Sequence, residues 1–256
     1  MNIIPLPVRE NAFGFTSALS FHEYIEQSQY YTELLPRRYD EIRIAADEQG
    51  FFSTYPDTLR FVVLVAEDSP ETVIILPILM RISDACPRFD LRILREDDHL
   101  DLLDSLIDDI DIGGSLGEMD LPMLLIFDEE WQFQAQWGPR PQAANEYLEA
   151  WLAENPLDET VEGHETLDSE EISSLLFNRL IHEMRVWYNS GLNHACAVEI
   201  RELLSALSDE SDAEDMDESH DESHDESSEE GNEISSNVVE SEENDLDEIL
   251  FEFENF

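Results

Sequence analysis

The sequence has no lysine, only two cysteines and no apolar run long enough to cross a membrane. All 13 basic residues are arginines. Cys86 and Cys196 stand 110 positions apart without a CxxC pair, which argues against a disulfide framework and against a zinc site. No run of 18 apolar residues occurs, and the N-terminus lacks a basic region followed by an apolar stretch. These absences predict a cytoplasmic protein without a membrane partner, a metal ion or another cofactor.

Acidic residues, in contrast, are abundant along the whole chain. Residues 208–256 hold 22 acidic residues and no arginine, which leaves 40 acidic residues against 13 arginines, a net charge of −27, for residues 1–207. Such a body repels itself at low salt, and the Debye length falls to about 3 Å at 1 M salt. The composition therefore favours halophilic adaptation, with a chance deficit of lysine as the alternative. Binding to nucleic-acid phosphates is disfavoured in either case.

The most informative stretch is residues 61–77, FVVLVAEDSPETVIILP. The apolar run 61–66 is typical of a buried central strand. A sharp corner follows, where Ser69 is a suitable N-cap and Pro70 fits the first position of a helix. Pro77 lies within that helix, where it removes one backbone hydrogen bond and kinks the axis. The sequence thus predicts a strand, a tight corner and a helix containing a proline.

Further elements continue this alternation. Apolar and charged residues alternate over 89–93, which predicts a strand. A helix is expected to begin at Asp97 and Asp98. Residues 123–137 form a predicted antiparallel hairpin, followed by a helix from about Gln142. The order βαβαββα, with the hairpin last, is the arrangement of a thioredoxin core. We therefore expect an α/β thioredoxin-like fold with a central mixed sheet flanked by helices.

The flanking segments differ in character. Residues 20–48 have a helical pattern that Pro36 is expected to divide into two helices, and Gly191 separates two further helices, of which the second should end at Leu207. Past Ser208 the chain is dominated by Asp, Glu and Ser and is expected to be disordered. The predicted divisions are an N-terminal arm (1–19), a thioredoxin-like domain with its helical extension (20–155), a helical pair packed on that domain (156–207) and an acidic tail (208–256).

Two features of the tail suggest binding. His220 and His224 stand among carboxylates and could hold a divalent cation weakly, although a solvated charged run is the favoured interpretation. The segment Leu246–Phe256 alternates acidic and apolar residues, a pattern typical of a docking motif for a protein partner.

Four stretches carry a resemblance to a known family: LREDDHLDLLD (94–104), DLPMLLIFD (120–128), WGPRP (137–141) and RVWYNSG (185–191). Residues 20–205 resemble a bacterial thioredoxin family whose active-site corner reads W-C-G-D, followed after five residues by a proline. Alignment on Pro77 assigns that corner to residues 68–71 and the second cysteine of a thioredoxin to position 72. The resemblance implies a thioredoxin fold in a member that has lost its active-site cysteines. The degenerate corner consists of Asp68, Ser69, Pro70, Glu71 and Thr72.

The same resemblance implies a binding groove. Pro122 takes the position of the cis-proline that faces the active-site corner, and the expected groove residues are Leu121, Pro122, Trp137, Gly138 and Arg140. Arg140 begins a helix, so it could bind an anion there. The favoured alternative is an ion pair with Asp68 or Glu71. The four tryptophans of the chain are expected to be core or edge aromatics.

Thiol–disulfide exchange needs a thiolate and a resolving thiol, and the corner has neither. Ser69 is a poor substitute because no histidine lies near it in sequence and the neighbouring carboxylates oppose an alkoxide. The leading hypothesis is a redox-inactive thioredoxin-like protein that binds a protein or peptide. One alternative is a thiol-disulfide oxidoreductase that uses Cys86 or Cys196 as a lone redox thiol. Another, based on composition alone, is a tail that binds histones or cations.

Overall fold

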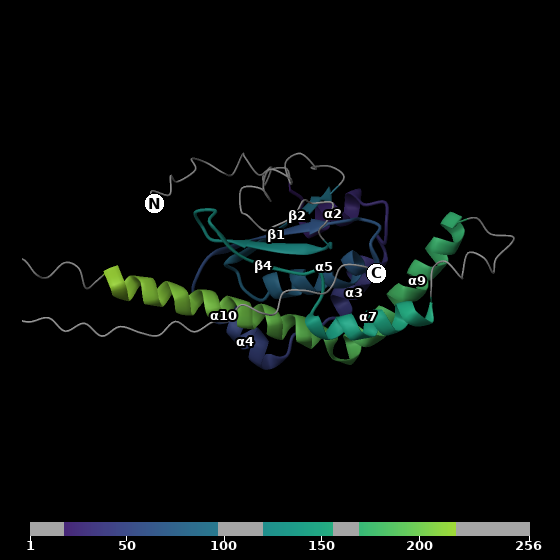
Figure 1. Cartoon of the computed structure of the whole chain (residues 1–256). Helices are drawn as coiled ribbons and strands as arrows, with labels where there is room; N and C mark the ends of the chain where they lie inside the picture. The colour runs from purple at the N-terminus through teal and green to yellow at the C-terminus, as the bar shows by residue number, and fades with distance from the viewer. Residues whose placement is uncertain (1–17, 97–119, 156–168, 219–256) are drawn as a thin grey trace, which may run out of the picture. The chain divides into compact units, whose positions relative to one another are not determined.

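A computed structural model of the chain describes residues 18–96, 120–155 and 169–218 (Figure 1). The chain divides into two units, Met1–Glu214 and Asp215–Phe256, and the four described strands lie in the first. The predicted helix at 97–98, the tail histidines and the Leu246–Phe256 motif lie outside the described residues.

The strands form one mixed sheet in the order β2-β1-β3-β4. Strand β1 pairs in parallel with β2 and antiparallel with β3, and β4 pairs antiparallel with β3. The α/β thioredoxin-like fold expected from the element order is confirmed. The strands are β1 (Leu59–Val65), β2 (Phe89–Arg95), β3 (Met123–Phe127) and β4 (Phe133–Trp137).

In the sequence, helices precede β1, connect β1 to β2, and follow β4. They are α2 (Phe21–Gln27), α3 (Leu34–Glu41), α4 (Ala46–Thr54), α5 (Pro70–Ser83), α7 (Gln142–Glu154), α9 (Ser169–Trp187), the short π-helical turn η3 (Tyr188–Leu192) and α10 (Asn193–Glu218). Within the described residues no helix combines the length and apolarity that a membrane crossing requires.

Strand β1 is apolar from Phe61 to Val65 because both of its faces are buried there. Phe61, Val63 and Val65 pack into a core cluster that also contains residues of α5, of the helices that precede β1 in the sequence and of the helices that follow β4. Val62 and Leu64 point to the opposite face, into a second cluster with residues of β3. A single strand thus connects two cores, which explains the continuous apolar run in the sequence.

The N-terminal helices correct one expectation. Pro36 does not separate two helices but lies in the first turn of α3, and the break comes earlier, between α2 and α3. The first turn tolerates proline because its backbone N–H groups have no intrahelical acceptor anyway. The start of α2 follows a local rule: the Ser20 hydroxyl accepts from the Glu23 backbone N–H, and the Glu23 carboxylate accepts from the Ser20 backbone N–H.

The C-terminal helices α9 and α10 are present, and their apolar residues Leu180, Met184 and Ile200 belong to the same core cluster as β1 and α5. Gly191, with φ of 157°, lies at the break between them. The second helix does not end at Leu207 but continues to Glu218. Ala, Glu and Met are good helix formers, and extending a helix is far easier than nucleating one.

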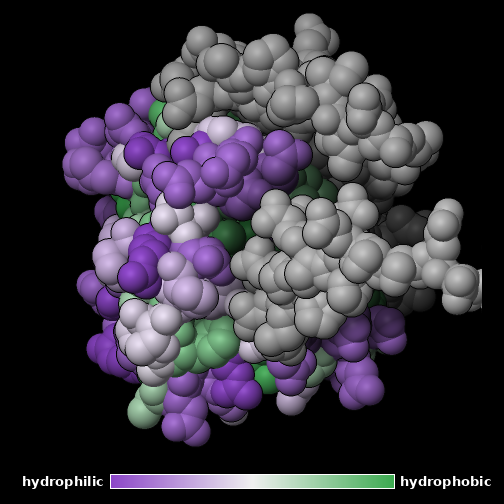
Figure 2. Space-filling view, turned by 90° about the vertical axis from the view of Figure 1, so that its left-hand side faces the viewer, coloured by the Kyte–Doolittle hydropathy of each residue, from purple (hydrophilic) through white to green (hydrophobic). Residues whose placement is uncertain are grey.

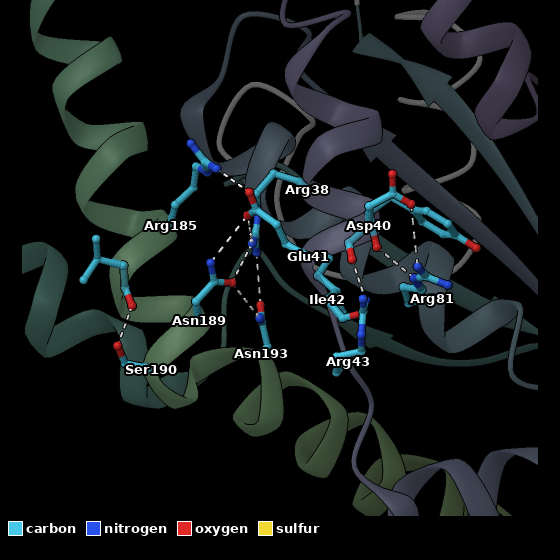
Figure 3. A network of polar contacts seen from close by, with 12 residues as sticks. Arg38, Asp40, Glu41, Ile42, Arg43, Arg81, Arg185, Asn189, Ser190 and Asn193 are labelled. Carbon is cyan, nitrogen blue, oxygen red and sulfur yellow. Dashed lines mark hydrogen bonds and ion pairs between the residues drawn. The ribbon is translucent and has the colours of Figure 1, made fainter.

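A buried arginine connects α3 to these C-terminal helices (Figure 3). Arg38 is 0% exposed, and its guanidinium donates to Glu41 (3.0 Å), Asn189 (2.8 Å) and Asn193 (3.1 Å). Arg185 donates to the other oxygen of Glu41. We call these five residues the Arg38 junction. Because the RVWYNSG stretch supplies Arg185 and Asn189, that stretch has a structural role in this chain.

The surface of the face shown in Figure 2 is mainly hydrophilic, with a smaller hydrophobic area between the polar residues. Exposed large apolar side chains in the described residues include Tyr30, Tyr147, Leu152, Leu175 and Val186. Four of these five residues lie on α7 and α9, two on each helix.

Candidate functional site

The corner between β1 and α5 is built by its own local sequence. After Val65, the Ala66 carbonyl accepts a hydrogen bond from the Ser69 backbone N–H at 3.3 Å. The Ser69 hydroxyl then accepts from the Glu71 backbone N–H at 3.2 Å, and Pro70 occupies the first turn of the helix. Ser69 is therefore an N-cap, as its residue type and position predict.

The corner is also held from outside. The Tyr31 hydroxyl donates to the Asp68 carbonyl at 3.2 Å, so the N-terminal helical extension contacts the corner directly. Thr72, at the position of a second thioredoxin cysteine, is only 1% exposed, and its hydroxyl has no hydrogen-bond partner in the described part of the chain. Of the two positions that would carry cysteines, only Ser69 is partly accessible.

The loop before β3 and the loop after β4 pack against each other. The Leu121–Pro122 peptide bond is cis, as is Gly138–Pro139. Gly138 has a φ of +137°, and a Cβ atom at this position would lie 2.5 Å from the Pro122 carbonyl oxygen. A side chain at position 138 would therefore collide with backbone, so only glycine permits this contact.

Arg140 connects the same loop to the corner. Its Nη2 donates to a Glu71 carboxylate oxygen at 3.0 Å, and its Nε donates to the other oxygen. Nη1 also donates to Asn145 at 3.3 Å. The hydrogen bonds that Arg140 donates to Glu71 raise the pKa of the Arg140 guanidinium above its ordinary value, against the opposing effect of burial. We call Arg140, Glu71 and Asn145 the Arg140 junction; of the two interpretations of Arg140, the ion pair with Glu71 is the one present.

Glu199 of α10 completes this region and was not found from the sequence. One carboxylate oxygen accepts from the Trp137 indole N–H and the other from the Gln142 backbone N–H, each at 2.8 Å. A carboxylate from another helix therefore caps the N-terminus of α7, where Pro141 provides no side-chain cap. No local signal marks Glu199, because its partner at Gln142 is 57 positions away.

The structure thus brings the predicted residues into one connected region. Gly138 contacts the loop of Pro122, and two residues further on Arg140 holds Glu71 at the corner. Within the described part of the chain, neither the backbone N–H nor the carbonyl of Leu121 has a hydrogen-bond partner. Leu121 itself is 9% exposed, its loop is linked to the corner through Gly138 and Arg140, and the corner residues 68–72 include no thiol.

Comparison with known proteins agrees with this geometry. A family model described as "Thioredoxin" matches residues 18–152, more than half of the chain. The chain belongs to the thioredoxin family.

Two solved structures share the thioredoxin-family fold of this chain at low sequence identity. One is a protein of unknown function from Pseudomonas aeruginosa, with 15% identity and a TM-score of 0.53, covering 78% of this chain and 99% of that one. The other is an HIV epitope scaffold, with 14% identity and a TM-score of 0.51, covering 77% of this chain and 97% of that one. No curated protein matches the sequence.

The two cysteines of this thioredoxin-family chain are not among the corner residues 68–72. Cys86 is 1% exposed and follows α5, and Cys196 is 0% exposed within α10. Burial, together with the nearby Glu199 charge, raises the pKa of the Cys196 thiol well above its ordinary value. Among the described residues, no group of three or more His, Cys, Asp and Glu side chains is arranged to hold a metal ion.

Proposed function

We propose that this protein is a redox-inactive member of the thioredoxin family that binds an extended peptide at the groove between the corner and the Pro122 loop. The observation that carries the proposal is the backbone of Leu121, next to Pro122, which has no hydrogen-bond partner among the residues that the structure describes. An extended peptide can pair with such groups through its own backbone, as in strand addition. We also propose that the corner descends from a W-C-G-D site whose cysteines have been replaced.

The chemistry of the corner supports a binding role. Thiol–disulfide exchange proceeds through a thiolate and a mixed disulfide. Ser69 offers a hydroxyl already engaged as an N-cap, and the hydroxyl of Thr72 is buried. The Arg140 guanidinium, which reaches the corner, is already paired with Glu71. Backbone pairing with a peptide needs none of these groups to react.

The alternative is an oxidoreductase that uses Cys86 or Cys196 as a lone thiol. Both thiols are buried, and the raised pKa of Cys196 keeps it in the unreactive thiol form. An insulin-reduction assay with dithiothreitol tests this alternative directly. We expect turnover at the background rate, and turnover that disappears with Cys86→Ser or Cys196→Ser would replace the binding proposal.

The binding proposal is tested with insulin B chain whose cysteines are carbamidomethylated, so that redox chemistry cannot contribute. Titration into ¹⁵N-labelled full-length protein should shift the amide signals of Leu121 and Ser69. Ser69→Trp, which fills the groove at the corner, should weaken binding about 10-fold, or about 1.4 kcal/mol. The matched control is Ser53→Trp, at an exposed position of α4.

Two results would contradict the proposal. One is the absence of signal shifts at Leu121 and Ser69 while the B chain binds elsewhere on the protein. The other is an equal loss of affinity in the Ser69→Trp and Ser53→Trp variants, which would show that the added indole acts without regard to position.

A further inference from the structure

Helices α7 and α9 lie side by side (Figure 1) and enclose a cleft of about 240 Å³. The lining side chains recur at intervals of three or four residues on each helix, so that each helix contributes one stripe. At one end the rings of Tyr147 and Trp187 lie with centroids 5.6 Å apart at 42°. The residues used below are Tyr147, Trp151 and Glu154 of α7, and Arg179, Glu183 and Trp187 of α9.

Arg179 distinguishes this cleft from other parts of the surface. Of the arginines in residues 18–96, 120–155 and 169–218, it is the only one without a hydrogen bond, an ion pair or a ring contact. The protein has 62 acidic residues against 13 arginines, so an unpaired guanidinium is unusual. It is available to an anion that enters the cleft.

The remainder of the cleft suits a cation. The faces of tyrosine and tryptophan rings attract cations, quaternary ammonium groups in particular. Tyr147 is 48% exposed, and Trp151, at 7%, is nine-tenths buried. Among the residues that the structure describes, the Trp151 indole N–H has no acceptor, so an oxygen atom of a ligand in the cleft would satisfy it. The carboxylates of Glu154 and Glu183 add negative charge.

We propose that this cleft binds a small zwitterion that carries a quaternary ammonium group and a carboxylate. The ammonium group lies against the rings of Tyr147 and Trp187, near the Glu183 carboxylate. The ligand carboxylate pairs with Arg179. The volume of about 240 Å³ is below the range of roughly 300–1,000 Å³ for drug-sized ligands, so the ligand is a small molecule.

The test uses glycine betaine as the probe, with isothermal titration calorimetry on the full-length protein at one fixed NaCl concentration. We expect saturable binding with a Kd below about 10 mM. R179Q should weaken binding at least about 10-fold, because a charge-assisted pair is lost. Y147A should weaken it about 3- to 5-fold, the range for an exposed cation–π contact.

Matched control variants guard against general effects of betaine on protein hydration. R37Q removes an arginine from the exposed ion pair with Glu33, and Y30A removes a tyrosine that is also 48% exposed. Both should bind betaine as the wild type does. All four substitutions affect side chains outside the core, and far-ultraviolet circular dichroism checks that each variant is folded.

Two single-charge probes decide whether both halves of the zwitterion matter. Choline, which has the ammonium group alone, and propionate, which has the carboxylate alone, should each bind at least about 10-fold more weakly than betaine. The assignment is overturned if no saturable betaine binding is seen, if R179Q and Y147A bind as tightly as the wild type, or if choline matches betaine.

Discussion

Two arginine junctions use the same arginine–glutamate chemistry in different surroundings. In the Arg38 junction the arginine is 0% exposed and has partners on its own helix, on η3 and on α10. In the Arg140 junction the side chains of Arg140 and Glu71 are 17% and 15% exposed, and they join one loop to the corner. The first holds the C-terminal helices on the domain, and the second joins the WGPRP loop to the corner.

This difference in burial determines what each junction contributes. A buried guanidinium has no access to water, so each partner it loses leaves an uncompensated donor. A partly exposed one can recover some hydration when its partner is removed. We therefore expect the stability of the fold to depend strongly on Arg38, while Arg140 matters mainly for the geometry of the groove.

The largest expected effect comes from Arg38→Met, compared with Arg37→Met at the neighbouring position. Loss of Arg38 leaves the Asn193 side-chain oxygen without its donor, while Asn189 keeps the hydrogen bond from Asn193, and should lower the free energy of unfolding by about 3 kcal/mol. Arg37→Met, at a side chain that is 70% exposed, should change the free energy of unfolding by less than about 0.5 kcal/mol. Urea unfolding measures both, and equal losses would remove burial as the explanation.

Acid should act on the Arg38 junction through Glu41. Burial by itself raises the pKa of Glu41, but hydrogen bonds from Arg185, Arg38 and Asn189 outweigh it and lower the pKa below the ordinary value of 4.5. The stabilisation from Glu41 is thus complete above the pKa of the unfolded chain and is lost as pH falls through the lower folded value. The stability difference between wild type and Glu41→Gln, measured by urea unfolding, should therefore shrink below about pH 4.5; a constant difference would contradict this.

The Arg140 junction is tested with a double-mutant cycle of Arg140→Gln and Glu71→Gln. The coupling energy should be about 1 kcal/mol, within the usual range for residues in contact. The ¹⁵N spectra of the single variants should change around Gly138 and Leu121 more than around Asn189. Additive effects of the two substitutions would show that the ion pair does not hold the loop.

A smaller effect is expected at the corner itself. Ser69→Ala removes the N-cap of α5 and should lower the free energy of unfolding by about 1 kcal/mol, whereas Ser69→Gly should lower it by only a few tenths. Chemical denaturation distinguishes the two. If glycine is the worse substitution, the corner depends on the conformation of residue 69 more than on its hydroxyl.

The smallest change in stability is expected from salt. A salt titration tests whether the acidic surface of the protein destabilises the fold by self-repulsion. Residues 1–218 keep 47 acidic residues and 13 arginines, so removing residues 219–256 should not abolish self-repulsion. Raising NaCl from about 0.1 M to 0.5 M should raise the melting temperature of both proteins by about 2–4 °C, because the Debye length contracts from about 10 Å. A melting temperature independent of salt in the truncated protein would contradict halophilic adaptation of the body.

Much of the fold could be predicted because its signals are local. The apolar run of β1, the Ser69–Pro70 corner and the alternation of the hairpin each depend on neighbouring residues, and the structure has all three. Two boundaries were wrong for a related reason. Pro36 was judged a helix breaker and the acidic run after Leu207 a helix end, yet the first turn accepts proline and α10 extends to Glu218.

The sequence by itself determined the sheet, the capped corner and the absence of a thiol from that corner, because strand patterns, N-caps and residue identities act over a few positions. Only the tertiary structure decided which distant groups meet. It brought Glu199 to the start of α7, Asn189 and Asn193 to Arg38, and Arg140 to Glu71 rather than Asp68. The physical reason is that hydrogen bonds and ion pairs depend on distance in space, which local patterns do not encode for residues 57 to 155 positions apart.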